Sequence, residues 1–352
     1  PSGVNYMHLV DHARRHIETN FRRPWAERLA RAALGRVLPD PSLFRPLLAL
    51  ARLFAPLARR LPGAVGRMAR LTPGPTAASP DTGARAVADG VTTYPAVGAR
   101  RYRVALLAGC VQRTLAPAIN AATIRLLTRH GCEVVLVSTP ACCGAMETHL
   151  GQGAAGRASA AAVVRALSAL IEAGGLDAVI SNASGCGTMI KDYGHLFRAD
   201  PDRAGPAARI SGLTRDISEF VAHIGLRAPV IEPGLAVAYQ SACSLRHGQK
   251  VTTQPVALLA HCGFIVTEPA EAHICCGSAG TYNILQGAIA DRLRAQKAAS
   301  LIALKPEVVV SGNIGCMMQL GAVLPFPVVH MVELLDWATG GPCPPGLAEA
   351  GY

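Results

Sequence analysis

The sequence predicts an α/β protein with two pseudo-symmetric repeats, each a parallel sheet flanked by helices, preceded by an all-helical basic segment. Two observations predict the repeats. Apolar, strand-like runs alternate with helical stretches from residue 103 onward, and four cysteines recur in the same order in each half. A third observation, an excess of arginine confined to the first third of the chain, predicts the basic segment. The 352 residues are enough for one large or two medium domains with a sizeable core.

Composition excludes two classes of protein. Half of the residues are hydrophobic and only 16% are charged, which argues against disorder. The longest apolar runs have the length of strands, which argues against a polytopic membrane protein. The first residues lack a basic and apolar leader, and a chain without an export signal keeps its cysteines reduced. We therefore expect a cytoplasmic protein, with peripheral contact with the inner membrane as a further expectation.

The basic segment is expected over residues 1–61. Residues 1–103 contain 17 arginines, no lysine and six acidic residues, whereas residues 104–352 carry no net charge. The arginines alternate with leucines and phenylalanines, which is typical of amphipathic helices. We expect three such helices, near residues 5–20, 25–37 and 42–60. This surface suits an acidic partner, an anionic membrane face, or a solvated face whose apolar side packs on the rest of the chain. No nucleic-acid motif accompanies it.

Residues 62–102, rich in Pro, Gly, Ala, Ser and Thr, are expected to be a linker or an extended surface segment. The first repeat is expected over residues 103–225, and the second repeat, with the C-terminal tail, over residues 226–352. The predicted strands are 104–108, 133–137 and 178–181 in the first repeat and 236–239, 264–267 and 307–310 in the second. Helical stretches separate these strands, which predicts parallel pairing.

A cysteine follows each predicted strand, and several of these cysteines lie in glycine-rich turns. The first cysteine set comprises Cys110, Cys142, Cys143 and Cys186, and the second cysteine set comprises Cys243, Cys275, Cys276 and Cys316. The step from the first cysteine to the adjacent pair is 32 residues in both repeats. Because loops at the carboxyl ends of parallel strands converge at one edge of the sheet, we expect each set to meet in one pocket.

Four thiolates suit either an iron–sulfur cluster or a tetrahedral zinc ion. The adjacent pair favours a cluster, because two neighbouring cysteines are awkward ligands for a single tetrahedral ion. Zinc in one repeat, and thiols without metal, stay open at this point. We predict that all eight cysteines are ligands. The candidates for tuning the sulfurs are the backbone of Gly144 and Gly277, the hydroxyls of Ser184 and Ser278, and His149 or His273, although each histidine also suits an ordinary packed or exposed position. Cys132 and Cys262 precede strands and are expected to be buried core residues.

The repeated Cys…Cys-Cys-Gly…Cys pattern resembles the cysteine-rich CCG domain. That domain occurs in one of the subunits of heterodisulfide reductase, in one of those of anaerobic glycerol-3-phosphate dehydrogenase, in lactate-utilisation proteins and in the iron–sulfur subunit of glycolate oxidase. The likeness is strongest to the glycolate oxidase type. It is carried by SGCGTMIKDYG at 184–194, CCGSAGTYN at 275–283, GNIGC at 312–316 and HMVELLD at 330–336.

Two departures from the family pattern matter. The family ends each repeat with CxxC, but Met189 and Gln319 stand where the second cysteine would be. The resemblance therefore implies a 4Fe-4S cluster or a zinc ion in each repeat, and argues against a five-cysteine noncubane cluster. The family also carries an N-terminal ferredoxin-like domain with two four-iron clusters, and Pro1–Val4 resemble the residues after its last cysteine. We therefore expect that domain to precede this chain and to pack on the basic helices.

The function implied by the resemblance is electron transfer. The chain would be the iron–sulfur subunit of a glycolate oxidase (glycolate dehydrogenase) complex, passing electrons from a partner FAD subunit to a quinone or another acceptor. It would be a component of an oxidoreductase without substrate chemistry of its own. In agreement, the sequence has no GxGxxG after a strand and no Walker A motif. The alternatives are a thiol/disulfide redox enzyme of the heterodisulfide-reductase type and a zinc-stapled platform that docks flavin subunits.

Overall fold

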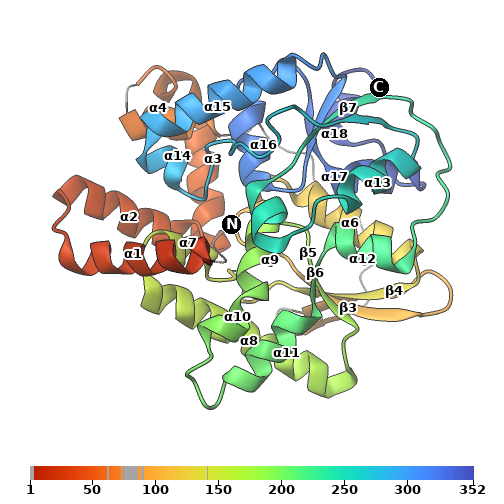
Figure 1. The fold of residues 1–352 in the computed structure, drawn as a ribbon, viewed down its shortest axis with the longest axis horizontal. Helices are drawn as coiled ribbons and strands as arrows, with labels where there is room; N and C mark the ends of the chain where they lie inside the picture. Colours follow the sequence, from red (N-terminus) through yellow and green to blue (C-terminus); the bar gives the residue numbers. More distant parts are fainter. Residues whose placement is uncertain (1–3, 62, 73, 75–85, 89–90, 141) are drawn as a thin grey trace.

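The fold consists of two sheets with helices on both faces of each (Figure 1). The computed structural model describes residues 4–61, 63–72, 74, 86–88, 91–140 and 142–352. Each sheet contains one of the predicted repeats, and a helical segment precedes them. The predicted fold class is therefore confirmed.

The first sheet has the strand order β1-β2-β4-β3-β5-β6. Its strands are β1 (Ala86–Ala88), β2 (Val91–Tyr94), β3 (Tyr102–Leu107), β4 (Cys132–Val137), β5 (Ala178–Ser181) and β6 (Thr214–Asp216). Strands β3 to β6 pair in parallel, whereas β2 pairs antiparallel with both β1 and β4. The first repeat thus gains two antiparallel strands at its edge from the segment that precedes it.

The second sheet has the strand order β10-β9-β7-β8 and is parallel throughout. Its strands are β7 (Ala236–Gln240), β8 (Ile265–Thr267), β9 (Val308–Ser311) and β10 (Val328–His330). If the parallel strands are numbered from the start of each repeat, both sheets have the spatial order second, first, third, fourth: β4-β3-β5-β6 and β8-β7-β9-β10. The repeat in the sequence therefore corresponds to a repeat in the fold.

Between the two sheets lies a shared layer of four helices: α6 (Pro117–Arg129), α12 (Ile217–Ile224), α13 (Gln254–His261) and α17 (Met331–Ala338). Alternate strand residues explain this arrangement. Val104 and Leu106 of β3 face the shared layer, as do Val237 and Tyr239 of β7, and all four are buried. The two repeats therefore share one hydrophobic core.

The strand residues that lie between these, on the other face of each sheet, pack against two outer layers of helices. On the first sheet, Ala105 and Leu107 pack against α8 (Gly153–Gly174), α10 (Tyr193–Leu196) and α11 (Ala204–Leu213). On the second sheet, Ala238 and Val309 pack with Leu301 of α15 (Gly287–Ile302) and with α16 (Ile314–Gly321). The short helices are α5 (Gln112–Leu115), α7 (Ala145–His149), α9 (Ser184–Lys191), η1 (Ser244–Gln249), α14 (Tyr282–Leu285) and α18 (Pro345–Ala348).

Helix α8 is long and apolar enough to cross a membrane, judged by length and composition alone. Its residues Val163, Val164, Leu167 and Ile171 are buried against the first sheet. The core of the first repeat thus accounts for the hydrophobic character of this helix.

The N-terminal helices α1 (Tyr6–Asn20), α2 (Trp25–Val37) and α3 (Pro41–Ala58) occur where the arginine–leucine pattern predicts them. Asn5 and Asp40 begin α1 and α3 by accepting hydrogen bonds from backbone N–H groups of the first turn. Helices α1, α2 and α3 lie on the left of Figure 1 together with α4 (Gly63–Arg70).

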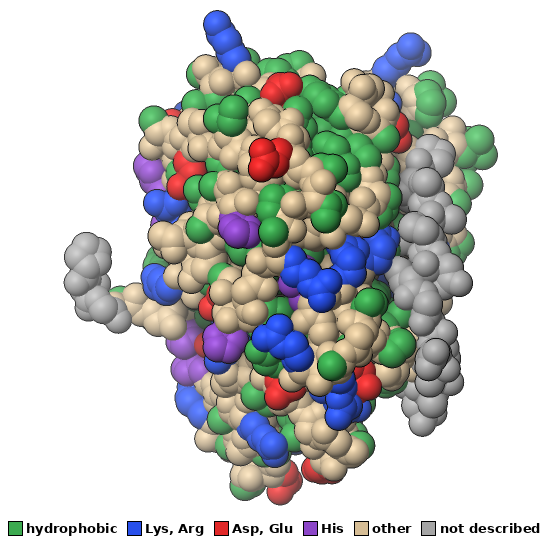
Figure 2. Space-filling view, turned by 90° about the vertical axis from the view of Figure 1, so that its right-hand side faces the viewer, with side chains coloured by type: hydrophobic (Ala, Val, Ile, Leu, Met, Phe, Trp, Pro, Cys, Tyr) green, Lys and Arg blue, Asp and Glu red, His purple; other side chains and the backbone are tan. Residues whose placement is uncertain are grey.

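The segment 62–102, expected to be a linker, contains α4, β1 and β2 and so has more regular structure than expected. Residues 62, 73, 75–85 and 89–90 of this segment lie outside the described residues. On the opposite side of the molecule from α1 to α4, basic and acidic side chains are scattered among apolar ones (Figure 2). This mixture agrees with the absence of net charge in residues 104–352.

Candidate metal centres

The first cysteine set lies at the carboxyl edge of the first sheet. Cys110 follows β3, Cys142 and Cys143 lie between β4 and α7, and Cys186 lies in the first turn of α9, directly after β5. Cys110, Cys142 and Cys143 are buried, and Cys186 is half-buried. Three separate strand ends thus bring these four residues to one place, as the parallel topology predicts.

The second cysteine set repeats this placement. Cys243 follows β7, Cys275 and Cys276 lie between β8 and α14, and Cys316 lies in the first turn of α16, directly after β9. Cys276 and Cys316 are buried, whereas Cys243 and Cys275 are half-buried. The second set is therefore the more exposed of the two.

Within each set the thiols contact each other in the same order. In the first set, hydrogen bonds from Cys110 and Cys143 lower the pKa of Cys142, and Cys143 in turn contacts Cys186. The second set has the same chain of contacts, from Cys243 to Cys275, Cys276 and Cys316 in that order. Hydrogen bonds from Cys243 and Cys276 lower the pKa of Cys275. The first cysteine of each adjacent pair is therefore the favoured thiolate.

Backbone amides reinforce this preference. Gly144 N–H donates to Cys142 Sγ, and Gly277 N–H donates to Cys275 Sγ, both at 3.3 Å. The two glycines have φ angles of 89° and 85°, which a residue with a side chain rarely adopts. A Cβ atom would also meet the carbonyl oxygen of Gly156 in α8 at the first position and of Ala290 in α15 at the second. Both glycine backbones thus donate a hydrogen bond to a cysteine sulfur, as their predicted role requires.

In the part of the chain that the structure describes, no three His, Cys, Asp or Glu side chains form a ready shell for a metal ion. The thiols hydrogen-bond to each other instead, and Cys276 Sγ lies 3.0 Å from Cys316 Sγ. Sulfur atoms around a tetrahedral zinc ion with bonds of about 2.3 Å are about 3.8 Å apart. The thiols are therefore gathered in one pocket at hydrogen-bonding distance, and they must move apart to surround a metal.

A carboxyl group adjoins the first cysteine set. Glu147 Oε2 lies 3.3 Å from Cys142 Sγ, and Ser159 donates a hydrogen bond to Oε1 at 2.8 Å. Burial, together with the charge of Cys142, raises the pKa of Glu147 to about 7. The protonated carboxyl can thus donate a hydrogen bond to the Cys142 thiolate. In the second repeat the corresponding residue, five after the first cysteine of the pair, is Gly280.

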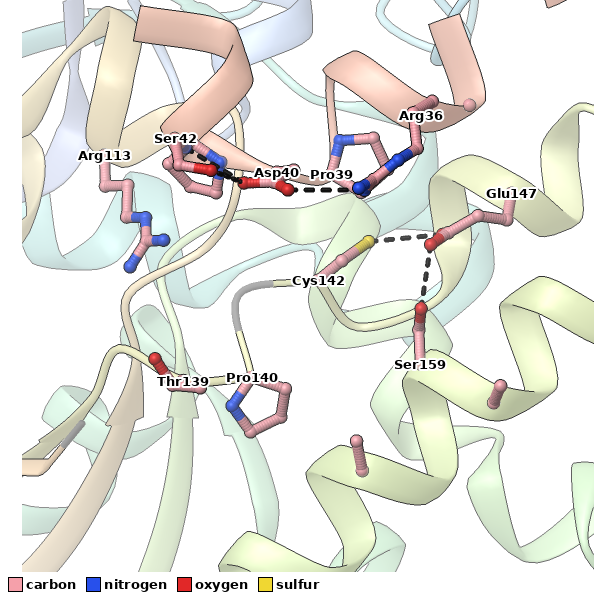
Figure 3. Close-up of a pocket in the computed structure, with 14 residues that line it drawn as sticks. Arg36, Pro39, Asp40, Ser42, Arg113, Thr139, Pro140, Cys142, Glu147 and Ser159 are labelled. Atoms are coloured by element: carbon pink, nitrogen blue, oxygen red, sulfur yellow. Dashed lines mark hydrogen bonds and ion pairs between the residues drawn. The ribbon is translucent and has the colours of Figure 1, made fainter. Parts of the chain in front are cut away.

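A cavity of about 640 Å³ opens beside Cys142 (Figure 3). The turn between α2 and α3, with Arg36, Asp40 and Ser42, forms one wall, and Cys142, Glu147 and Ser159 lie across from it. Arg113 also lines the cavity and donates to the carbonyl oxygen of Ser138. The N-terminal helices therefore take part in enclosing the first cysteine set.

An ammonium group adjoins the second cysteine set. Lys297 of α15 is fully buried, and its Nζ donates to the carbonyl oxygens of Glu271 and Ala272, each at 3.1 Å. Its positive charge contributes to the lowered pKa of Cys275. In the first repeat the corresponding residue is Val163 of α8. Val163 lies seven positions after Gly156, which packs on Gly144, and Lys297 lies seven positions after Ala290, which packs on Gly277.

The two sets face each other across a polar contact between the repeats. Ser184, which begins α9, shares a hydrogen bond of 2.7 Å with Ser244, the residue after Cys243. Asn313, which begins α16, donates to Ser184 Oγ at 2.8 Å. The helix that contains Cys186 is thus hydrogen-bonded to two of the loops that hold the second set. Ser184 therefore joins the repeats, and the sulfur contact predicted for its hydroxyl is not found among the described residues.

Sequence reasoning missed three side chains at these sites: Glu147, Lys297 and Tyr193. Tyr193 is fully buried, and its hydroxyl donates to the carbonyl oxygen of Cys143 at 2.8 Å. The sequence contained no signal for Lys297, because polar and apolar residues alternate along α15 without a clear apolar face, and Ile289 and Ile302 of this helix are exposed. Glu147 had no signal either, whereas Tyr193 lies in the motif at 184–194, although its contact with the cysteine loop was not predicted. Cys132 and Cys262 are buried away from both sets, as predicted.

Comparison with known proteins gives consistent results. A family model described as a cysteine-rich domain, CCG, matches residues 104–191 and 237–321. The chain is 35% identical over 339 residues to the glycolate oxidase iron-sulfur subunit of Escherichia coli (strain K12), covering 96% of this chain and 78% of that protein. It is 30% identical over 356 residues to the probable glycolate oxidase iron-sulfur subunit of Bacillus subtilis (strain 168), covering 97% and 79%. Lactate utilization protein A of Geobacillus thermodenitrificans (strain NG80-2) is 26% identical over 243 residues, covering 66% and 98%.

Proposed function

The chain belongs to the family of glycolate oxidase iron–sulfur subunits with CCG domains, and we propose that each of its cysteine sets holds a 4Fe-4S cluster that transfers electrons. As an iron–sulfur subunit of an oxidoreductase, it would receive electrons from an FAD-containing partner subunit that oxidises glycolate. It would pass them to a quinone or another acceptor. The observation that carries this proposal is the gathering of four thiols, in the same contact order, at the same edge of two sheets.

The residues present fit an iron–sulfur cluster. Cysteine thiolates are its usual ligands, and backbone N–H groups near the sulfurs help to set its potential. Cys142 and Cys275, each with a lowered pKa and an N–H donor, supply the thiolate character that binding needs. The remaining cysteines of each set would complete the four ligands. A bound cluster would supply one-electron chemistry, which the side chains alone do not have.

The chain's own residues would hold the two centres next to each other. Hydrogen bonds between Ser184, Ser244 and Asn313 join the loops of the two sets across the repeat boundary. The buried core around Cys143 and Cys276 excludes water from part of each site. An electron could then move between the centres inside one rigid core, while substrate chemistry stays in the partner subunit.

The N-terminal helices supply a surface for partners. Five large apolar side chains of α3 are exposed: Leu47, Leu50, Leu53, Phe54 and Leu57. A group of large exposed apolar side chains on one helix is typical of an interaction site. We propose that the ferredoxin-like domain of the family packs on these helices. We further propose a cytoplasmic location, in which the arginines support peripheral contact with the inner membrane.

The cavity beside Cys142 favours one rival function, a thiol/disulfide redox enzyme, because it would admit a small molecule to the first cysteine set. A zinc-stapled docking platform is the other rival. Anaerobic purification with iron, sulfide and zinc analysis separates them, together with an EPR spectrum of the reduced chain. Two iron centres with reducible signals support electron transfer, whereas stoichiometric zinc without such signals supports the platform. Disulfide turnover by the chain alone would support the enzyme.

The ligand assignment is tested by Cys142→Ser, with Cys132→Ser as the matched control. Cys142→Ser should remove the metal of the first centre, because it removes a favoured thiolate, and should leave that of the second centre. Cys132→Ser should leave both, since Cys132 lies in the core at the opposite end of β4. Metal content is the measurement, and equal losses in the two variants would contradict the assignment.

A further inference from the structure

Lys297 occupies a position on α15 where the helix otherwise buries small or apolar residues, between Ala290 and Leu301. Its side chain has no exposure to solvent. Its only hydrogen bonds in the described structure are those to the carbonyl oxygens of Glu271 and Ala272. Both acceptors lie a few residues before the adjacent pair of the second cysteine set, so a buried positive charge is fixed beside the cysteine loop.

This charge lacks an ion-pair partner among the described residues. Glu268 acts on Lys297 only at longer range and already pairs with Arg246 at 3.3 Å. A buried cation with neutral partners alone is strongly unfavourable. Burial lowers the pKa of Lys297, and the strongest opposing influence comes from the thiols of Cys276, Cys316 and Cys275. The negative charge that would stabilise the ammonium group thus lies in the second cysteine set.

We propose that Lys297 is the buried counter-charge of the second metal centre and that it makes this centre the easier of the two to reduce. The proposal rests on the proposed function, since it requires iron–sulfur clusters in both sets. Reduction adds one electron, supplied by the reduced flavin of the partner subunit, and therefore one negative charge. Lys297 keeps its proton throughout. A fixed positive charge in a poorly screened interior favours the more negative form.

The first repeat has no equivalent charge. Val163 occupies the corresponding position and is fully buried. The ionisable side chain in contact with Cys142 is Glu147, which brings no positive charge. Arg113 interacts electrostatically with Cys110, but it is only half-buried beside the cavity and donates to the carbonyl oxygen of Ser138, whereas Lys297 has no exposure to solvent. Electrons that enter the chain would accordingly collect at the second centre.

The test is an EPR-monitored redox titration of the full chain, purified anaerobically, with iron content measured in parallel. Cys142→Ser and Cys275→Ser assign the two signals. Lys297→Met, which keeps the volume and removes the charge, should lower the equilibrium constant for reduction of the second centre at least tenfold, a shift of about 59 mV for one electron. Lys297→Arg should retain the wild-type potential. Val163→Met, a neutral change at the corresponding position, should leave both potentials unchanged.

The outcomes separate the two proposals. If Lys297→Met binds as much iron as the wild-type chain and both potentials are unchanged, the counter-charge is wrong while the proposed function stands. If the wild-type chain binds no iron, the proposed function fails and this inference with it. Lys297→Met could instead lose iron from the second centre alone. In that case, a wild-type iron content in Lys297→Arg supports the counter-charge role of Lys297, and iron loss in both variants refutes that role. Lys297→Gln replaces Lys297→Met if circular dichroism shows that the latter is unfolded.

Discussion

The two repeats share a backbone plan and differ in charge. Both present four thiols from equivalent strand ends, with a glycine N–H on the first cysteine of the pair. Beside those thiols, the first repeat has the carboxyl of Glu147, and the second has the ammonium of Lys297. The fold thus determines where the sulfurs lie, while residues outside the repeated pattern determine the electrostatic environment of each site.

The same contrast recurs where each repeat packs on the other. Helix α17 of the second repeat packs on α6 of the first, and α12 of the first packs on α13 of the second. In the former contact, Asp336 is 1% exposed and pairs with Arg125 and Arg129, each at 2.5 Å. Ala222 is at the corresponding position of α12 and is exposed. Both contacts therefore contain apolar packing, and the contact of α6 with α17 adds a buried carboxylate with two arginine partners.

The largest effect is expected from Asp336→Ala. It would leave two guanidinium groups without their carboxylate, which should lower the free energy of unfolding by about 4 kcal/mol. Ala222→Ser, at the corresponding position of the other contact, should change it by less than about 0.5 kcal/mol. Urea denaturation of both variants measures the difference. Similar effects of the two substitutions would mean that the two contacts are equivalent.

The sequence was sufficient to predict the parts of the fold that depend on local pattern. Strand β5, at 178–181, was predicted at its observed bounds because a short apolar run buried on both faces has few alternatives. The cysteine sets followed from the topology of parallel sheets. Strands β1 and β2 were missed, because β2 forms by pairing with β4 and β1 by pairing with β2, and both lie in a segment of turn-forming composition.

The chemistry around the sulfurs was less predictable. Glu147 reaches Cys142 from the next turn of chain, but a glutamate in a short helix gives no sign of burial. Lys297 lies in a helix whose sequence has no clear apolar face, and its neighbours in space are 25 and 26 residues away in sequence. Such contacts between distant segments become visible only when the outer helices are placed on the sheets.

A second prediction concerns the residues that begin α12 and α17. Asp216 and His330 occupy the same position, and each accepts a hydrogen bond from a backbone N–H of the first turn. Burial raises the pKa of Asp216 to about 6 and lowers that of His330 to about 4. The contribution of Asp216 to stability is present below its unfolded pKa of 3.8 and is lost as the pH rises through 6. That of His330 is present above its unfolded pKa of 6.5 and is lost as the pH falls through 4.

Asp216→Asn and His330→Asn should consequently have opposite pH dependence. Relative to the wild-type chain, Asp216→Asn should become more stable by about 3 kcal/mol as the pH rises from 4 to 6. His330→Asn should become less stable, relative to the wild-type chain, by about 3 kcal/mol as the pH rises from 4 to 6.5. Urea denaturation at several pH values provides the measurement. A change of the same sign in both variants would show that the two caps do not differ in this way.

The smallest effect is expected from Tyr193→Phe, which acts on the first repeat alone. The hydroxyl of Tyr193 donates to the buried carbonyl of Cys143, whereas Val323, at the corresponding position after Cys316, is exposed and has no hydroxyl. Loss of this hydrogen bond should lower the free energy of unfolding by about 1 kcal/mol. Because the bond fixes the loop of the adjacent pair, iron should also be released faster from the first centre under chelation, while the second centre keeps the wild-type rate. Val323→Ala is the control and should leave both rates unchanged. If Tyr193→Phe accelerated iron release equally at the two centres, the loops of the two cysteine sets would loosen together. The polar contact through Ser184, Ser244 and Asn313 would then couple the two centres more tightly than the different charges beside them suggest.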